Sequence, residues 1–293
     1  MALREQLEDV NAVTVTPFGG HDVDRDGVRR NARFLADAGI RLIVCGGNTG
    51  EFYALSPEEL RAVVEETVAA VPRDVVVLAA TGYRAELAAE LAHAGLEAGA
   101  HGVMIHWPVQ PGAGEDGLAR YYAWVIGAIQ APTVLYVRGS LLTERVLETA
   151  RAAGELVGVK YAVPDLGAFA RLAAAAPDLA WICGLAEGWA PFFWQAGARG
   201  FTSGLACVAP ARSLDLLHAL REGAAGTVLR LWHELLPFEQ LRDRHARAND
   251  VAVVKAALDR IGLAGGAVRP PLSALSDEDR AELDAILASW GVA

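Results

Sequence analysis

PTVLYVRG at residues 132–139 and ELVGVKYA at 155–162 are short apolar runs rich in β-branched residues, separated by a stretch with helical periodicity. Six further runs of this kind lie at 11–18, 40–47, 74–82, 101–108, 179–186 and 198–204. Eight strands alternating with helices are typical of a (β/α)8 barrel, in which helices cover the outside of a parallel sheet. The sequence therefore predicts an α/β protein with a TIM-barrel fold. A doubly wound open sheet is the alternative, because a strand count does not show closure.

Helix boundaries and domain organisation follow from the same sequence. Ser56, Pro57 and Glu59 have the spacing of a capping box with a proline at the first helical position, which predicts a helix from residue 57. Gly39 and Gly99 are expected to end helices before the next strand. No linker, repeat or low-complexity run divides the chain. We expect the barrel over residues 1–222 and C-terminal helices over 223–293, packed together as one structural unit.

Composition excludes several classes of partner. The net charge of −10 argues against a surface for nucleic acid or anionic membrane, although one or two local cations suffice for an anionic substrate. The three cysteines are odd in number and far apart, so no disulfide framework is expected and a reducing compartment fits. The first ten residues, MALREQLEDV, carry charges where a signal peptide is apolar, and no apolar run is long enough to span a bilayer. We therefore expect a cytoplasmic protein.

Strand alternation predicts which side chains face the barrel interior. In LYVRG, Tyr136 and Arg138 share one face, and the apolar Leu135 and Val137 share the other. The same alternation in the next strand places Gly158 and Lys160 inward, with Val157 and Val159 outward. Active sites of such barrels lie at the C-terminal ends of the strands. The phenol of Tyr136 and the amine of Lys160 are thus expected on neighbouring strands at the active-site end.

Lys160 stands out because the chain uses arginine almost everywhere else. Of its 26 basic residues, Lys160 and Lys255 are lysines and the other 24 are arginines. Burial lowers the pKa of a lysine, and Arg138 nearby would act in the same direction. A neutral amine forms a Schiff base with a ketone, whereas a guanidinium does not. We predict imine chemistry at Lys160 rather than a side chain that extends to solvent, and a structural role for Lys255.

Three motifs resemble those of a known family of enzymes. Gly47-Asn48-Thr49-Gly50-Glu51, Tyr136 and Gly158-Val159-Lys160, in this order and with barrel spacing, resemble the dihydrodipicolinate synthase/N-acetylneuraminate lyase family of class I aldolases. The likeness extends from VTPF at 15–18 to RPPLSAL at 269–275. It implies that Lys160 is the Schiff-base lysine and Tyr136 a proton-shuttling tyrosine, and that the loop 47–51 holds a substrate carboxylate. It also implies a homo-oligomer, a tetramer or a dimer.

Departures from the family pattern affect the expected reaction. Asn48 stands where the synthase has threonine, no tyrosine lies near Gln110, and the arginine that binds the second substrate aligns with Leu141. A genuine 4-hydroxy-tetrahydrodipicolinate synthase is therefore disfavoured. Arg138, the TGEF sequence and Tyr83 resemble the 5-dehydro-4-deoxyglucarate dehydratase branch more closely, although Asn48 and Val137 differ there too.

The resulting hypothesis is a class I lyase acting on a 2-oxo acid. Lys160 condenses with the ketone, the iminium accepts electrons from the next carbon, and Tyr136 relays a proton. Aldol cleavage, condensation and dehydration all remain open at this point. Trp107, Glu187 and Ser203 are candidates for the far end of the site. The expected substrate-binding residues are Gly47, Asn48, Thr49, Gly50, Arg138, Thr202 and Ser203.

No cofactor or metal is expected. The run 21–27 imitates the start of a calcium loop, but position twelve of that loop is Arg33 instead of glutamate. His101 and His106 lie five apart on one strand and face opposite sides, and no nucleotide-binding glycine motif follows a strand. A barrel that binds an oxo acid without turnover is the non-enzymatic alternative.

Overall fold

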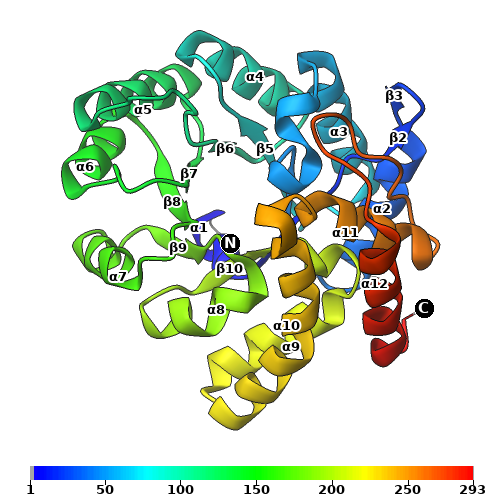
Figure 1. Ribbon diagram of the computed structural model, residues 1–293. Helices are drawn as coiled ribbons and strands as arrows, with labels where there is room; N and C mark the ends of the chain where they lie inside the picture. The colour runs from blue at the N-terminus through cyan, green and yellow to red at the C-terminus, as the bar shows by residue number, and fades with distance from the viewer. Residues whose placement is uncertain (1–2, 293) are drawn as a thin grey trace.

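A computed structural model describes residues 3–292 of the chain, and its eight parallel strands close into a barrel (Figure 1). The first strand of the barrel pairs in parallel with both the second and the last, so the doubly wound alternative is excluded. All eight predicted strands are present. They are β1 (Val10–Val13), β4 (Leu42–Cys45), β5 (Val76–Thr81), β6 (Gly102–Ile105), β7 (Thr133–Val137), β8 (Leu156–Tyr161), β9 (Ala180–Cys183) and β10 (Gly200–Ser203).

One helix follows each strand and lies on the outside of the barrel (Figure 1), which confirms the predicted (β/α)8 fold. The capping box at Ser56 is formed, and Gly39 and Gly99 both follow helices with φ of +99°. A short hairpin of β2 (Phe18–Gly19) and β3 (Asp22–Val23) precedes the first of these helices. The outer helices are α2 (Arg25–Asp37), α3 (Pro57–Ala70), α4 (Ala85–Glu97), α5 (Glu115–Ile129), α6 (Glu144–Ala153), α7 (Leu166–Ala175), α8 (Ala186–Gln195) and α9 (Pro210–Glu222).

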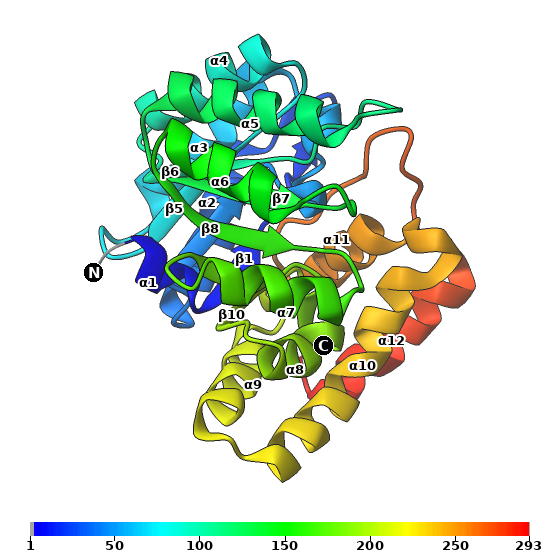
Figure 2. The same ribbon diagram turned by 90° about the vertical axis from the view of Figure 1, so that its left-hand side faces the viewer.

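Three more helices extend the barrel on one side (Figure 2): α10 (Ala225–Arg247), α11 (Asp250–Arg260) and α12 (Asp277–Trp290). Helix α10 packs on α8 and α9. Helix α11 contacts two short 3-10 helices, η1 (Asn48–Gly50) and η3 (Leu205–Cys207), which follow β4 and β10. The C-terminal helices therefore reach the active-site end of the barrel. The division at residue 222 coincides with the end of α9 but stays a prediction. No helix among residues 3–292 is both long and apolar enough to cross a bilayer.

The core has two layers, as the alternation predicted. Leu135, Val137 and Val159 belong to the cluster between strands and outer helices, whereas Tyr136 belongs to a separate cluster inside the barrel. Helix α1 (Leu3–Leu7) contributes its buried Leu7 to the inner cluster. The prediction for Val157 is wrong.

Val157 is half-buried and packs against the inner cluster. The ladder between β7 and β8 has a register irregularity beside Thr133 and Val134, where Thr133 pairs with Leu156 and Val134 with Gly158. Simple alternation along β8 therefore fails at Val157. It holds from Gly158 onward, because an added Cβ at Gly158 would meet the inward-facing Leu7.

Lys255 ties α11 to the end of the loop after β4. Its ammonium forms an ion pair with Glu51, and its Nζ donates to the carbonyl of Ala267 at 2.7 Å. Both side chains are buried, and the other oxygen of Glu51 accepts the backbone N–H of Arg269 at 2.8 Å. Glu51 itself has a left-handed backbone, with φ of 59°. The pair thus holds the turn that ends the 47–51 loop, in agreement with a structural role for Lys255.

Replacing Lys255 by methionine should lower the free energy of unfolding by about 3–5 kcal/mol, because the Glu51 carboxylate would stay buried without its cation. Urea or guanidinium denaturation measures the change. The matched control is Glu65→Gln, which removes the half-exposed ion pair of Glu65 with Arg61 and should cost less than about 1 kcal/mol. Equal losses in the two variants would contradict a special role for the buried pair.

Candidate active site

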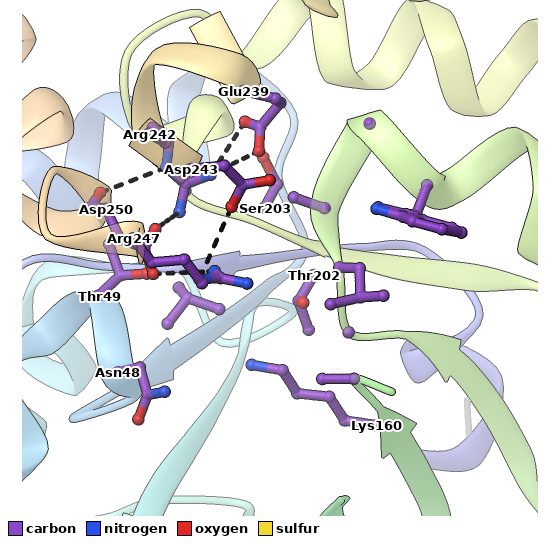
Figure 3. A pocket seen from close by; sticks show the side chains of 18 of the residues that line it. Asn48, Thr49, Lys160, Thr202, Ser203, Glu239, Arg242, Asp243, Arg247 and Asp250 are labelled. Carbon is purple, nitrogen blue, oxygen red and sulfur yellow. Dashed lines mark hydrogen bonds and ion pairs between the residues drawn. The ribbon is translucent and has the colours of Figure 1, made fainter. Parts of the chain in front are cut away.

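A cavity of about 400 Å³ opens at the C-terminal ends of the strands. Figure 3 shows that two groups of side chains face each other across it. The barrel side contributes Asn48, Thr49, Tyr136, Lys160, Thr202 and Ser203, and the C-terminal helices contribute Glu239, Arg242, Asp243, Arg247 and Asp250.

Lys160 lies on the inner face of β8, directly opposite Tyr136 on β7. Only 4% of the residue is exposed, and its Nζ lies 4.0 Å from the centre of the Tyr136 ring. Burial lowers the pKa of Lys160 to about 7; the Asp250 carboxylate opposes this change, and the guanidinium of Arg138 adds to it. A large share of the amine is therefore neutral near physiological pH.

The phenol of Tyr136 is buried beside this amine and stays protonated. Burial raises the pKa of Tyr136 to about 12, with a smaller opposing effect from Arg138. The amide Nδ2 of Asn48 donates to the phenol oxygen at 3.1 Å. Asn48 lies in the loop after β4 and thus orients the Tyr136 hydroxyl. The asparagine at position 48 therefore has a specific contact, with the tyrosine.

His106 also supports Tyr136, a role that the sequence did not reveal. Its ring meets the Tyr136 ring edge to face, with centroids 5.2 Å apart, and stacks on Phe52 at 4.2 Å. Burial lowers the pKa of His106 to about 3, and the Lys160 cation acts in the same direction. A neutral imidazole packed in this way fixes one side of the tyrosine. The sequence pattern indicated only that His106 and His101 face opposite sides, which disfavours a shared metal site.

The predicted loop 47–51 forms one end of the cavity. Asn48 and Thr49 line it, whereas Gly47 and Gly50 lie behind them and do not. A Cβ at Gly50 would lie 2.8 Å from the Thr14 carbonyl oxygen, and one at Gly47 would collide with Val13. The two glycines therefore permit close packing of the loop on β1, with Asn48 and Thr49 presented to the cavity.

Thr202 and Ser203, at the end of β10, line the cavity as predicted. The hydroxyl of Ser203 donates to Glu187 Oε1 at 2.6 Å and accepts the backbone N–H of Ala206 at 2.7 Å. Ser213 donates to the same carboxylate oxygen at 2.5 Å. Glu187 is fully buried behind the serine, and this burial raises its pKa. Glu187 thus orients Ser203 but does not itself line the cavity.

A network of charges from α10 and α11 forms the opposite side (Figure 3). Nη1 of Arg242 donates to both oxygens of Glu239, at 2.9 and 3.0 Å, and its Nη2 donates to Asp250 at 2.5 Å. Asp250 also accepts from Arg247 at 3.0 Å. Burial raises the pKa of Glu239 to about 7, while Arg242 opposes the change. These residues were not among the predicted site residues; the charged run LRDRHARAND at 241–250 marks Arg242, Arg247 and Asp250 but not Glu239.

Arg138 does not line the cavity that contains Lys160. It lines a second cavity of about 300 Å³. The two cavities share Asn48, Arg247 and Asp250. Trp107 lines neither, and packs close to Gly139, where an added Cβ would lie 2.7 Å from its ring.

Within the described part of the chain, no three His, Cys, Asp or Glu residues are arranged to hold a metal ion. The run 21–27, which imitates a calcium loop, instead forms part of the β2–β3 hairpin and the start of α2. There Asp24 caps the helix by accepting the N–H of Gly27 at 2.9 Å.

Comparison with known proteins decides the family. The model of the dihydrodipicolinate synthetase family matches residues 6–289. The chain belongs to this family. Membership makes it a Schiff-base-forming class I lyase, as the resemblance implied.

Two solved structures of the family have nearly the same fold. A dihydrodipicolinate synthase from Oceanobacillus iheyensis is 38% identical with a TM-score of 0.94, covering 99% of both chains. One from Bacillus clausii is 39% identical with a TM-score of 0.95, covering 99% of this chain and 100% of the other.

Curated proteins with similar sequences are named as dehydratases, whereas the two solved structures are named as synthases. Proteins called "Probable 5-dehydro-4-deoxyglucarate dehydratase" include one from Saccharopolyspora erythraea, which is 34% identical over 91% of this chain and 88% of its own length. Another, from Streptomyces coelicolor, is 36% identical over 92% of this chain and 88% of its own. The predicted likeness to the dehydratase branch is thereby confirmed.

The burial of Lys160 gives a testable pH dependence. The rate at which acetic anhydride acetylates Lys160 should rise through a midpoint near pH 7, because only the neutral amine reacts. In Asp250→Asn the midpoint should fall, since the carboxylate that favours the charged amine is lost and Arg242 and Arg247 become less neutralised. Peptide mass spectrometry across a pH series measures both. A midpoint near the ordinary lysine value would contradict the proposed environment, as would an upward change in the variant.

Proposed function

We propose that this protein dehydrates a 2-oxo sugar acid of the 5-dehydro-4-deoxyglucarate type through a Schiff base on Lys160. The observation that carries the proposal is the buried Lys160 amine, whose Nζ lies 4.0 Å from the Tyr136 ring centre, in a cavity that also holds Asn48 and Thr49. A lysine whose pKa is lowered to about 7 by burial has the neutral form that attacks a ketone.

Imine formation needs a proton donor, and Tyr136 is placed for this role. The amine of Lys160 adds to the ketone carbon, and the resulting carbinolamine loses its hydroxyl as water when it is protonated. The phenol keeps its proton at neutral pH, because burial raises its pKa to about 12. Asn48 Nδ2 donates to the phenol oxygen, so the phenol proton is not used in this contact and can be given to the substrate.

Dehydration follows from the electron demand of the iminium. The phenolate of Tyr136, formed when the phenol protonates the carbinolamine hydroxyl, takes a proton from the carbon next to the iminium, and the electron pair of that C–H bond forms an enamine. The enamine then expels the hydroxyl on the following carbon as water, and the phenol of Tyr136 is available to protonate this leaving group. In 5-dehydro-4-deoxyglucarate the carbon next to the ketone is a methylene and the following carbon carries a hydroxyl, so its structure suits this sequence of steps.

Loop 47–51 is proposed to hold the carboxylate next to the ketone. Thr49 lines the cavity, and the loop offers backbone N–H groups of the short helix η1. Thr202 and Ser203 line the same cavity and supply hydroxyl groups for the rest of the substrate. Gly47 and Gly50 act only through the close packing of the loop. Arg138, in the second cavity, is proposed to act at the entrance.

The names of the curated relatives favour dehydration over synthase activity. This agrees with the departures from the synthase pattern: asparagine instead of threonine at position 48, no relay tyrosine near Gln110, and Leu141 where the resemblance implies a substrate-binding arginine. Condensation of the synthase type is the second candidate. It is favoured by the TM-scores of 0.94 and 0.95 with structures called dihydrodipicolinate synthase at 38–39% identity.

We further propose that the protein works as a homo-oligomer in the cytoplasm. All three cysteines are buried and free, which fits a reducing compartment. Large apolar side chains are exposed in the loop after β6, at Val109 (66%), and on α10, at Leu229 (55%), and such side chains could be covered by another copy of the chain.

Borohydride reduction in the presence of pyruvate tests the proposed function. Wild-type protein should gain the mass of one reduced pyruvate adduct, and peptide mapping should place it on Lys160, with Lys255 unmodified as an internal control. Lys160→Arg keeps the positive charge but should give no adduct, because a guanidinium does not form the imine.

Tyr136→Phe separates imine chemistry from proton transfer. This variant should still be trapped by borohydride, although more slowly because water must then supply the proton for imine formation, while dehydration of 5-dehydro-4-deoxyglucarate should be slowed about 10²–10⁴-fold through loss of the acid–base group. A folded wild-type protein that forms no adduct with pyruvate or the sugar acid would contradict the Schiff-base mechanism and favour a binding protein without turnover.

A further inference from the structure

A non-helical turn at the C-terminal end of α10 carries Arg247 into the cavity. Three consecutive residues, His245, Ala246 and Arg247, have φ of 56°, 53° and 71°, in the left-handed region that residues other than glycine seldom adopt. The turn follows the regular part of α10, whose helical geometry ends at Arg244. A run of this kind persists only where surrounding contacts hold it.

The contacts that hold the turn converge on one carboxylate of α12. Asp279 is 2% exposed and accepts from Arg244 Nη1 at 2.5 Å and His245 Nε2 at 3.2 Å. It also accepts from Asn249 Nδ2 at 3.0 Å. Residues on both sides of Arg247 are thus attached to Asp279, although α12 itself does not line the cavity.

Of the two guanidinium groups that line the cavity in the described part of the chain, that of Arg247 has N–H groups still available. Arg242 is buried and engaged by Glu239 and Asp250. The side chain of Arg247 is 44% exposed; one nitrogen donates to Asp250 at 3.0 Å, and another lies 3.6 Å from Asp243. Figure 3 shows its guanidinium extending over the cavity, on the side facing Lys160 and Thr202.

The charge and position of Arg247 suit a carboxylate of the substrate as its ligand. This carboxylate is a second one, distinct from the carboxylate next to the ketone that loop 47–51 is proposed to hold. An arginine binds a carboxylate through two parallel hydrogen bonds, which a hydroxyl does not match. The long, exposed contact with Asp243 is of the weak kind that a substrate carboxylate replaces readily. Arg247 also lines the second cavity, together with Arg138.

We propose that Arg247 determines specificity by binding the distal carboxylate of a six-carbon 2-oxo dicarboxylic acid, and that Asp279 is the positioning residue that holds Arg247 in place. This inference rests on the proposed function, because the substrate is anchored at its other end by the imine on Lys160. Helix α12, which carries Asp279, thereby has a role in the site although it does not line the cavity.

Borohydride trapping with a matched pair of acids tests the inference. 2-Oxoadipate and 2-oxohexanoate have the same length and ketone position, but only the first carries a distal carboxylate. For wild-type protein the half-saturating concentration of 2-oxoadipate should be about 10-fold lower than that of 2-oxohexanoate, as expected for one charge-assisted contact. In Arg247→Met the two should become nearly equal.

Asp279→Asn should remove most of the same preference while leaving trapping of pyruvate unchanged. The double variant Arg247→Met/Asp279→Asn should behave like Arg247→Met alone, because Asp279 acts through Arg247. Asp284→Asn is the matched control on the same helix: it breaks the exposed pair with Arg260 and should keep the wild-type preference. The cap of α12 survives in Asp279→Asn, since Ser276 accepts the backbone N–H of residue 279.

Several outcomes would overturn the inference. Equal trapping of the two acids by wild-type protein would remove the specificity role of Arg247. An unchanged preference in Asp279→Asn would remove the positioning role, as would a further loss in the double variant. If wild-type protein traps pyruvate and any of these results is obtained, only the inference about Arg247 and Asp279 fails. If it traps no 2-oxo acid, the proposed function fails as well.

Discussion

The desolvation of one amine is the constraint on which the rest of this structure depends. Among residues 3–292 no carboxylate lies within ion-pair distance of Lys160, and the ring of Tyr136 occupies the space beside it. The inner cluster of the barrel, including Leu7 of α1, excludes water from below. These surroundings make the charged form costly, and the pKa of Lys160 falls to about 7. Closure of the barrel therefore also serves the chemistry, because it encloses the inner face of β8 on which the amine lies.

The site combines two halves with opposite physical character. The barrel supplies a half without carboxylates, in which His106 and Asn48 fix the tyrosine beside the lysine. Helices α10 and α11 supply a charged half, in which Arg242 joins Glu239 and Asp250. Buried ion pairs of this kind contribute little net stability and are better understood as fixing geometry. Imine chemistry belongs to the first half, and selection among 2-oxo acids is proposed to belong to the second.

Local sequence patterns predicted the barrel half well, since strand alternation depends only on neighbouring residues. Tyr136 and Lys160 face inward as expected, and Thr49, Thr202 and Ser203 line the cavity.

The orientation of Val157 was predicted wrongly, because a register irregularity with β7 is a property of two strands rather than one. Glu239, Arg247 and Asp250 were missed for a related reason. Their approach to the cavity depends on how α10 and α11 pack across the barrel end and on a left-handed turn without glycine, which no short-range pattern encodes. Arg138 was expected beside Lys160 but lies at the second cavity.

A crystal structure of the protein after borohydride reduction with pyruvate tests the central claim most directly. The account predicts continuous density from Lys160 Nζ to the second carbon of the former pyruvate, with the carboxylate at Thr49 and the amides of the 47–51 loop. The phenol of Tyr136 should lie within hydrogen-bonding distance of the new nitrogen or carboxylate. Density for an unmodified Lys160, with the label on Lys255 or on the N-terminal amine, would contradict it.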